Sequence, residues 1–317
     1  MWPESKPLHD LPGIHSIGEF SLSVPDLDDA VRFYSAFGLD VQTHDRHADL
    51  YTADGYRWGR VVAGERKFLR HLTLHCFDED FDGLQHNLDG LECARLSAPA
   101  WSDPLSDNFR SLWLRDPDGL LVQLRAGPKT SLHAAVRAQP APYVDGVRAA
   151  QYRRQIAAVK PQRLSHLARL TANVDTLVDF YARAFGLRLS DRSGKHVAFM
   201  HGRHGSDHHL LAFAGSSGAA LHHLSWDVPT IEDVGLGAMN MVAQGYKKGW
   251  GVGRHVLGSN YFYYVEDPWG SFCEYSSGMD FIPASMDWQP LDHAPEDAFF
   301  LWGPDVPPQM LVNSEAD

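Results

Sequence analysis

Residues 163–189 run RLSHLARLTANVDTLVDFYARAFGLRL, and residues 16–41 run SIGEFSLSVPDLDDAVRFYSAFGLDV. In both stretches an alternating apolar segment predicts a β-strand, and a turn then leads into a helix. Asp26 is a candidate N-cap in the earlier stretch, and Asn173 or Asp175 is one in the later stretch. Both contain an adjacent Phe-Tyr pair and then Phe-Gly-Leu. The chain therefore repeats one strand-turn-helix unit at an offset of 147 residues.

Two further pairs of segments follow in the same order. FLRHLTLHCFDE at 68–79 matches ALHHLSWDVPT at 220–230, and each predicts an alternating strand that leads into a helix. WLRDPDGLLVQL at 113–124 matches YYVEDPWGSFCEY at 263–275, where Asp-Pro-x-Gly predicts a tight turn between two strands. The offsets of all three pairs lie between 147 and 152 residues. This agreement in order and offset predicts a duplicated chain.

The duplication predicts the organisation of the chain. We expect an α+β fold of two tandem domains, with four βαβββ modules near 16–64, 69–126, 163–214 and 220–276. The expected divisions are a first domain over 1–126, a linker with an amphipathic helix over 127–162, a second domain over 163–280, and a tail over 281–317 that wraps the outside. A length of 317 residues suits two cores of ordinary size.

Composition argues against several classes of partner and location. The formal net charge is -12, and an acidic surface repels phosphate backbones, so nucleic acid is not expected as a partner. No stretch approaches the roughly 18 apolar residues of a membrane span, and the N-terminus lacks the pattern of a signal peptide. The cysteines, Cys76, Cys93 and Cys273, are scattered and form no CxxC pair. We expect a cytoplasmic protein with reduced thiols.

The two halves differ chemically at three matched positions. The first half has Glu19, His71 and Gln123, and the second half has His166, His223 and Glu274. Two imidazoles and one carboxylate form the facial triad of non-haem Fe(II) sites, which leaves room for a bidentate diol and dioxygen. Strand alternation places Glu274 on the same face as Phe272, and the repeat alignment selects His223 over His222. The sequence therefore predicts a metal site in the second half.

The same region resembles a known family. The motifs are LSHLAR at 164–169, HHLLAF at 208–213, LHHLSW at 221–226 and GRHVLGSNYFYYVEDPWGSFCEY at 253–275. In order and spacing they resemble the vicinal oxygen chelate superfamily and, within it, the two-domain type I extradiol ring-cleaving dioxygenases. The resemblance is strong from 163 to 278 and weaker before it. It implies sheets that cup around a central funnel and an N-terminal domain without metal.

The resemblance also implies a reaction. A catechol-type substrate would be cleaved beside its hydroxyl groups with O2, as in aromatic hydrocarbon catabolism, to give a ring-opened semialdehyde-type acid. Fe(II), or alternatively Mn(II), would be bound by the trio in the second half, His166, His223 and Glu274. The enzyme would then be an oxidoreductase that incorporates both atoms of O2, and relatives of this kind commonly form homo-oligomers.

Three more residues match the motifs of this family. By resemblance, His209 would stabilise bound oxygen and supply a proton, His255 would hydrogen-bond a substrate oxygen, and Tyr264 would contact the substrate hydroxyl. Several relatives have a polar residue where this chain has Leu257, so the polarity of the substrate stays open.

Other interpretations remain open for these residues. A glyoxalase-like isomerase or lyase would use the same modules with another metal, although its ligands are typically shared between paired modules. A sequestering protein of the bleomycin-resistance kind would be shorter and need no triad. Individually, each histidine could be a core or loop residue, and His208 competes with His209. The aromatic residues Trp226, Trp250, Phe262 and Trp269 could line a pocket or belong to the core.

Overall fold

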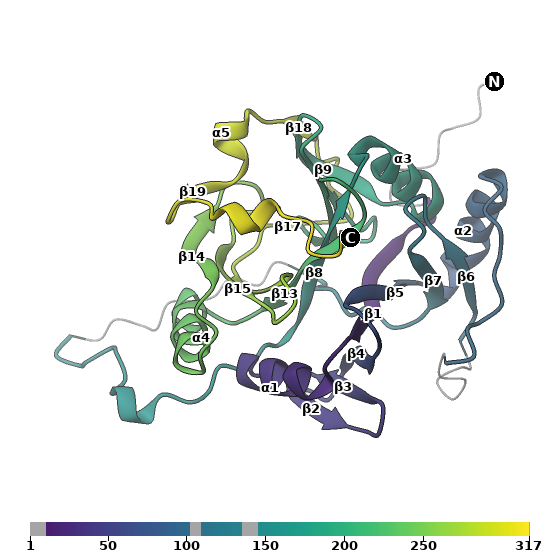
Figure 1. The fold of residues 1–317 in the computed structure, drawn as a ribbon. Helices are drawn as coiled ribbons and strands as arrows, with labels where there is room; N and C mark the ends of the chain where they lie inside the picture. The colour runs from purple at the N-terminus through teal and green to yellow at the C-terminus, as the bar shows by residue number, and fades with distance from the viewer. Residues whose placement is uncertain (1–10, 102–108, 135–144, 317) are drawn as a thin grey trace.

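The structure is a computed structural model and describes residues 11–101, 109–134 and 145–316. Two mixed β-sheets, one from each half of the chain, lie next to each other with helices packed on them (Figure 1). The α+β class expected from the sequence is confirmed. No helix within the described ranges is both long and apolar enough to cross a membrane.

The first sheet is built from residues 14–126. Its strands are β1 (Ile14–Val24), β2 (Asp40–Thr43), β3 (His47–Tyr51), β4 (Arg57–Ala63), β5 (Phe68–Cys76), β6 (Ser111–Arg115) and β7 (Leu121–Ala126). They lie in the order β2-β3-β4-β1-β5-β7-β6. Helix α1 (Leu27–Phe37) follows β1, and helix α2 (Asp78–Gly90) follows β5. The central strands β1 and β5 are antiparallel, whereas β1 with β4 and β5 with β7 are parallel.

The second sheet repeats this order. Its main strands are β8 (Arg163–Thr171), β9 (Arg188–Ser193), β10 (Val197–His201), β12 (Leu211–Gly215), β13 (Ala220–Asp227), β14 (Gly249–His255), β15 (Tyr261–Glu266) and β16 (Phe272–Ser277). Helix α3 (Val174–Phe185) follows β8, and helix α4 (Ile231–Ala243) follows β13. The order is β18-β9-β10-β12-β8-β13-β16-β15-β14-β19, in which both edge strands come from the C-terminal tail.

Strand register confirms the duplication residue by residue. His71 on β5 pairs with Ser21 on β1, and His223 on β13 pairs with Ala168 on β8, the position that matches Ser21 in the repeat. Gln123 on β7 is opposite Thr73, and Glu274 on β16 is likewise opposite Ser225. The matched positions inferred from sequence are therefore equivalent positions in two copies of one sheet.

Capping residues explain where the matched helices begin and end. The side chain of Asp26 accepts a hydrogen bond from the backbone N–H of Asp29, and Asn173, rather than Asp175, caps α3 in the same way. Gly38 and Gly186 end these helices in the left-handed conformation, which glycine adopts without steric cost.

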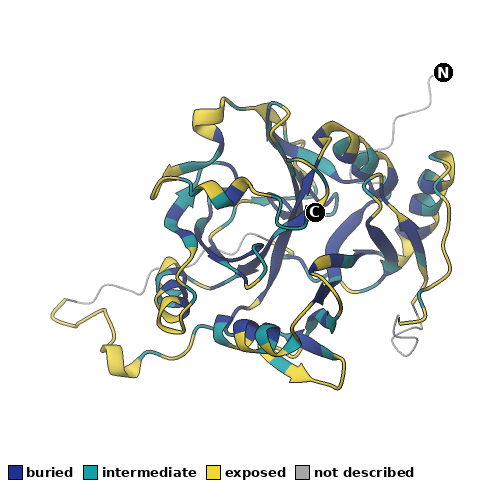
Figure 2. Cartoon of the chain, viewed as in Figure 1, coloured by how far each residue is buried: buried dark blue, intermediate teal, exposed yellow. Residues whose placement is uncertain are grey.

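The two halves share one apolar core, which occupies the interior of both sheets (Figure 2). Tyr275 on β16 stacks on Phe37 at the end of α1, with ring centroids 3.9 Å apart, and donates its hydroxyl to the Phe37 carbonyl at 2.8 Å. The buried Arg169 on β8 pairs with Asp116 of the first half. We propose that the two sheets define two domains that divide as the sequence predicts, with each holding the other in place.

Two expectations about the remaining segments need correction. Over residues 127–134 and 145–162 the linker contains no α-helix, and only the 3-10 turn η3 (Arg153–Gln155) forms there; residues 135–144 lie outside the described residues. Helical periodicity did not suffice because most of residues 145–160 is exposed, so a helix there would bury little apolar surface.

The tail does more than wrap the outside. It forms β17 (Phe281–Ile282), β18 (Leu291–Asp292), α5 (Pro295–Ala298), β19 (Phe300–Trp302) and the 3-10 helix η4 (Pro308–Leu311). β17 pairs with the short β11 (Ser206–Asp207), and β18 and β19 extend the second sheet. The second module also differs slightly from expectation, because a single bridge between Leu96 and Trp113 stands where a third strand was expected.

Candidate active site

Three side chains from three strands converge inside the second sheet. His166 projects from β8, His223 from β13 and Glu274 from β16. The Nε2 atoms of the two histidines are 3.0 Å apart, and the Oε2 atom of Glu274 lies 3.2 Å from Nε2 of His166 and 3.6 Å from Nε2 of His223. The trio predicted from the repeat is therefore brought together, and its ligand atoms form a compact cluster.

Burial and charge keep Glu274 and His223 in a metal-binding protonation state. Glu274 is fully buried, and burial alone would raise the pKa of its carboxyl, but the neighbouring His166 and His255 hold that pKa well below its ordinary value. Burial and the neighbouring His222 lower the pKa of His223 well below its ordinary value. An ionised carboxylate beside a neutral imidazole is what a cation requires of its ligands.

One atom of the trio has its hydrogen-bonding capacity unused. The Oε1 atom of Glu274 accepts a hydrogen bond from Asn260 at 3.1 Å, whereas the buried Oε2 atom accepts none from the residues that the structure describes. Two ligands about 2.1 Å from one ion and at right angles are about 3.0 Å apart, which matches the separation of the two Nε2 atoms. The donor set and the orphaned oxygen thus fit a metal ion.

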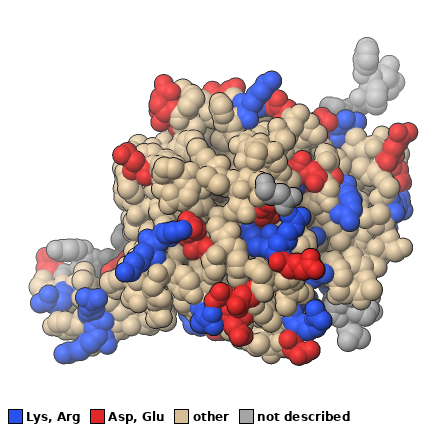
Figure 3. Space-filling view, in the orientation of Figure 1, with Lys and Arg blue, Asp and Glu red and all other residues tan. Residues whose placement is uncertain are grey.

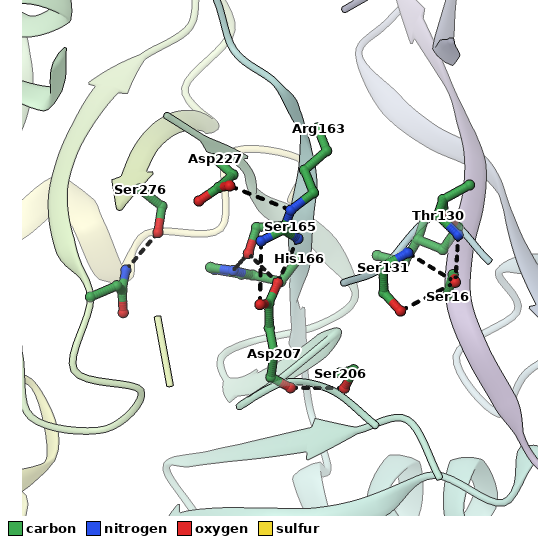
Figure 4. Close-up of polar contacts among 12 residues, drawn as sticks. Ser16, Thr130, Ser131, Arg163, Ser165, His166, Ser206, Asp207, Asp227 and Ser276 are labelled. Carbon is green, nitrogen blue, oxygen red and sulfur yellow. Dashed lines mark hydrogen bonds and ion pairs between the residues drawn. The ribbon is translucent and has the colours of Figure 1, made fainter. Parts of the chain in front are cut away.

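Neighbouring groups orient both histidine rings. Nε2 of His222 donates to the carbonyl oxygen of Met310 at 2.7 Å, so Nδ1 of a neutral His222 can only accept. That atom lies 2.6 Å from Nδ1 of His223, which must then donate and leave its Nε2 without a proton. Ser165 lies beside Nδ1 of His166, at 3.4 Å, and donates to Asp207, as Figure 4 shows.

The other predicted residues surround the trio. The ring of His209 lies 4.1 Å from that of His166, centroid to centroid, and burial lowers the pKa of His209 well below its ordinary value. His255 donates from Nδ1 to the carbonyl of Phe299 at 2.6 Å, so its Nε2 accepts from the hydroxyl of Tyr264 at 3.0 Å. Burial, followed by the charge of Glu274, raises the pKa of Tyr264 well above its ordinary value, and this hydroxyl stays protonated.

These groups open into an apolar cavity of about 240 Å³. Its lining consists of His166, Ala168, His196, Val197, Phe199, His209, Ala212, Ala214, Gly215, His222, His223, Trp250, His255, Leu257, Asn260, Tyr264, Ala298, Phe299, Met310 and Leu311. Among these described lining residues there is no Lys or Arg. Leu257, at the position where the sequence left polarity open, contributes an apolar surface. The four residues from 298 onward belong to the tail, which therefore closes one side of the cavity.

Of the aromatic residues considered from the sequence, one lines the cavity and three do not. Trp250 lines the cavity, whereas Trp226 is fully buried in the core and Trp269 packs against the core. Phe262 lies behind Trp250, with ring centroids 4.4 Å apart, and does not line the cavity. Sequence reasoning missed Asn260 and the tail residues, because neither a loop asparagine nor an aperiodic tail carries a local signal for a site.

The matched trio of the first half has a different chemistry. Glu19 pairs with Arg57 at 2.8 Å, and the register of β4 against β1 makes Arg57 the counterpart of His209. Gln123 accepts a hydrogen bond from Thr73 at 2.8 Å. Burial would raise the pKa of Glu19, but hydrogen bonding to His71 and the charge of Arg57 lower it to about 2. A guanidinium ion thus already balances the carboxylate of this copy.

Comparison with known proteins places the chain in a family. A family model described as the Glyoxalase/Bleomycin resistance protein/Dioxygenase superfamily matches residues 163–275. Metapyrocatechase 2 from Cupriavidus necator is 47% identical over 314 residues, which cover 99% of this chain and 96% of that protein. The chain belongs to the Glyoxalase/Bleomycin resistance protein/Dioxygenase superfamily. The family resemblance predicted from the motifs of the second half is confirmed.

Solved structures of similar fold carry names from two reaction classes. A Mn(II)-bound glyoxalase from Novosphingobium aromaticivorans has a TM-score of 0.74 and 24% identity, covering 95% of each chain. Homoprotocatechuate 2,3-dioxygenase from Brevibacterium fuscum has a TM-score of 0.73 and 19% identity, covering 96% of this chain and 94% of that one. At these identities the likeness shows the fold, and the reaction must be inferred from the site.

Proposed function

We propose that this protein is an extradiol dioxygenase that cleaves a catechol-type ring with O2, using Fe(II) bound by His166, His223 and Glu274. The observation that carries the proposal is the orphaned Oε2 of Glu274, which faces two histidine Nε2 atoms at the floor of an apolar cavity. The 47% identity to Metapyrocatechase 2, named for a catechol dioxygenase, supports the same reaction.

The bound metal would supply adjacent open positions where a diol and dioxygen meet, while the protein directs protons around them. Tyr264 lies against the ring of His223, with centroids 5.1 Å apart, and its hydroxyl would contact one substrate oxygen. His255 would hold Tyr264 in this orientation through the 3.0 Å hydrogen bond and would close the pocket. His209, over the ring of His166, would take up a proton from the diol, stabilise bound oxygen in this protonated form and return the proton as the ring opens.

The walls of the cavity favour an uncharged substrate. A charged substituent on the ring, away from the two hydroxyl groups, would be buried among Phe199, Leu257, Met310 and neighbouring alanines. The described lining residues include no cationic side chain to pair with it. A cavity of about 150 Å³ holds one benzene ring, so about 240 Å³ suits a monocyclic catechol with a small apolar substituent.

The decisive test is the fate of dioxygen in the product. The full-length protein, loaded anaerobically with Fe(II), is mixed with catechol and 18O2, and the product is followed by visible absorbance and mass spectrometry. A yellow ring-opened acid that contains two 18O atoms is expected. Consumption of a 2-oxoaldehyde thiol adduct without oxygen uptake would replace the proposal with the glyoxalase-like isomerase, and Mn(II)-loaded protein run in parallel identifies the preferred metal.

We further propose a cytoplasmic homo-oligomer. The three cysteines are unpaired thiols, as a reducing compartment permits. Residues 145–158 project away from the body of the molecule, and Arg side chains gather there (Figures 1 and 3). Val147 and Tyr152 are exposed on this segment beside Arg148, Arg153 and Arg154, and a second copy of this acidic chain would match them in charge. Light scattering tests this: a monomeric wild type would contradict the oligomer, and an unchanged mass in Tyr152→Ala would contradict an interface at this segment.

A further inference from the structure

Two pairs of adjacent histidines in this site are joined in the same way. Nδ1 of His208 lies 3.1 Å from Nδ1 of His209, just as Nδ1 of His222 lies 2.6 Å from Nδ1 of His223. Between two neutral imidazoles one nitrogen must donate and the other must accept. The direction of each pair is therefore determined by the group that contacts Nε2 of its first histidine.

For the pair of His208 and His209, that group is a carboxylate. Nε2 of His208 lies 2.9 Å from Oδ2 of Asp191, which can only accept, so Nε2 of His208 carries the proton. Nδ1 of His208 is then an acceptor and Nδ1 of His209 is its donor. Nε2 of His209 is left without a proton, on a ring that lines the cavity.

The surroundings of Asp191 keep it ionised and fixed. Its Oδ1 accepts a hydrogen bond from the backbone N–H of Leu291 at 2.9 Å and another from Nε2 of His293 at 3.0 Å. Burial would raise the pKa of Asp191, but the hydrogen bonds from His208 and His293 lower it below its ordinary value. His208 is itself almost completely buried, so this carboxylate faces it without competing water.

We propose that Asp191 is a positioning residue that, through His208, holds His209 in the tautomer with a proton on Nδ1 and a bare Nε2 towards the substrate cavity. This inference rests on the proposed function, because it assigns a purpose to the orientation of His209. The two pairs differ in the group that accepts the hydrogen bond from the first histidine. The His222 pair ends on a neutral carbonyl and keeps His223 a neutral ligand, whereas the His208 pair ends on a carboxylate that stabilises His209 when it takes up a proton.

The substitution Asp191→Asn tests this directly because the rest of the network dictates how the new amide is oriented. The N–H of Leu291 requires its carbonyl oxygen at the former Oδ1 position, so the amide NH2 faces Nε2 of His208. His208 must then donate from Nδ1, and His209 must accept there and carry its proton on Nε2. The isosteric variant thus reverses both tautomers without removing an atom from the network.

The first readout is the tautomer itself. Long-range 1H–15N correlation spectra of the full chain labelled with 15N-histidine, loaded with diamagnetic Zn(II) at pH 7.5, distinguish protonated Nδ1 from protonated Nε2. We expect the Nδ1–H form for His209 in the wild type and the Nε2–H form in Asp191→Asn. His208→Phe, which keeps a buried ring but no nitrogen, should give a mixture of tautomers, and His293→Phe should leave the wild-type form.

The second readout is turnover of catechol by the iron-loaded protein. Loss of the correct tautomer through an Asp-to-Asn change lowers kcat about 10⁴-fold in the serine-protease triad, and general acid-base groups contribute about 10²–10⁴-fold, so a fall in kcat in that range is expected for Asp191→Asn. KM should change little, because Asp191 does not line the cavity. His293→Phe should retain most activity.

Clear results would overturn this inference. A wild-type His209 protonated on Nε2 would mean that His208 is doubly protonated and donates through both nitrogens, and an unchanged tautomer in Asp191→Asn would remove the assigned role. Because the spectra are recorded without catalysis, either result is distinct from failure of the proposed function, which would appear as a wild-type protein that consumes no oxygen with any catechol.

Discussion

The Nε2 atoms of His166 and His223 face each other at 3.0 Å, and both side chains are buried. The hydrogen bond from His223 to His222 leaves the Nε2 of His223 with a lone pair, and the Oε2 of Glu274 adds a negative charge beside it. Such a concentration of acceptors is unfavourable in a buried site unless a cation sits among them. The strand register thus produces an arrangement that fits a metal ion.

Removing the carboxylate of Glu274 should abolish most metal binding. In Glu274→Gln a neutral amide replaces the charged ligand, and we expect metal affinity to fall roughly 100-fold or more, measured by competition with a chelator and by metal analysis of the purified protein. Glu19→Gln, at the equivalent position of His166 in the first half, is the matched control and should retain wild-type metal content. Equal iron in Glu274→Gln and wild type would contradict the assignment of the ligands.

His222 should support the metal without touching it. His222→Phe removes the acceptor that fixes the Nδ1–H of His223, so we expect a metal affinity about 10–100-fold weaker than in the wild type. Metal release into excess chelator measures the change. His208→Phe provides the comparison, since it changes the partner of His209 and not that of a ligand. Similar release rates for the wild type and His222→Phe would show that the pair has no such role.

Much of this site was predictable because duplication supplies an internal comparison. The alignment of Gln123 with Glu274 and of His71 with His223 selected the carboxylate and the member of the histidine pair that lies beside it, and strand register makes the aligned residues equivalent. Asp26 and Asn173 cap their helices as local chemistry requires. Sequence patterns with a fixed period or a fixed spacing thus predicted where these residues lie in the structure.

Contacts between distant segments were not predictable in this way. Asp191 on β9 reaches His208 in the loop before β12 only through tertiary packing, and Met310 accepts from His222 across 88 residues of chain. In the linker, the helical periodicity of the sequence predicted a helix that does not form in the described part. Residues 145–155 are exposed, and only η3 forms there. Tertiary packing decided these points, and single-sequence patterns do not contain it.

Substrate charge should decide which catechols are accepted. Burying an unpaired carboxylate against this cavity costs several kcal/mol, so kcat/KM for 3,4-dihydroxybenzoate should be at least about 100-fold below that for 4-isopropylcatechol, which is similar in size. Initial rates of oxygen uptake over a range of concentrations provide the comparison. A preference for the carboxylate would mean that the cavity recruits a cation from elsewhere.

Buried neutral histidines should make the fold sensitive to mild acid. Burial lowers the pKa of His15 to about 3 and that of His75 to about 4, whereas both titrate near 6.5 in the unfolded chain. Between pH 6.5 and 4 the unfolded state therefore binds more protons, and each group lowers the free energy of unfolding by about 1 kcal/mol per pH unit as the pH falls. Urea unfolding at several pH values should show this decline.

His15→Phe isolates one of these contributions. The phenyl ring keeps the packing against Phe77, where the rings are 4.3 Å apart, but cannot take up a proton in the unfolded state. The free energy of unfolding of this variant should therefore fall less steeply below pH 6.5 than that of the wild type. Parallel curves for the two proteins would mean that His15 is not the neutral, buried base described above.

The most direct measurement of the central claim is oxygen uptake as a function of bound iron. Metal-free wild-type protein is reconstituted anaerobically with increasing Fe(II), and the rate of oxygen consumption with catechol is recorded at each ratio beside Glu274→Gln. We expect activity to rise linearly and to saturate near one iron per chain, with little activity in the variant. Saturation well below one iron, or equal activity in Glu274→Gln, would contradict a single catalytic iron held by His166, His223 and Glu274.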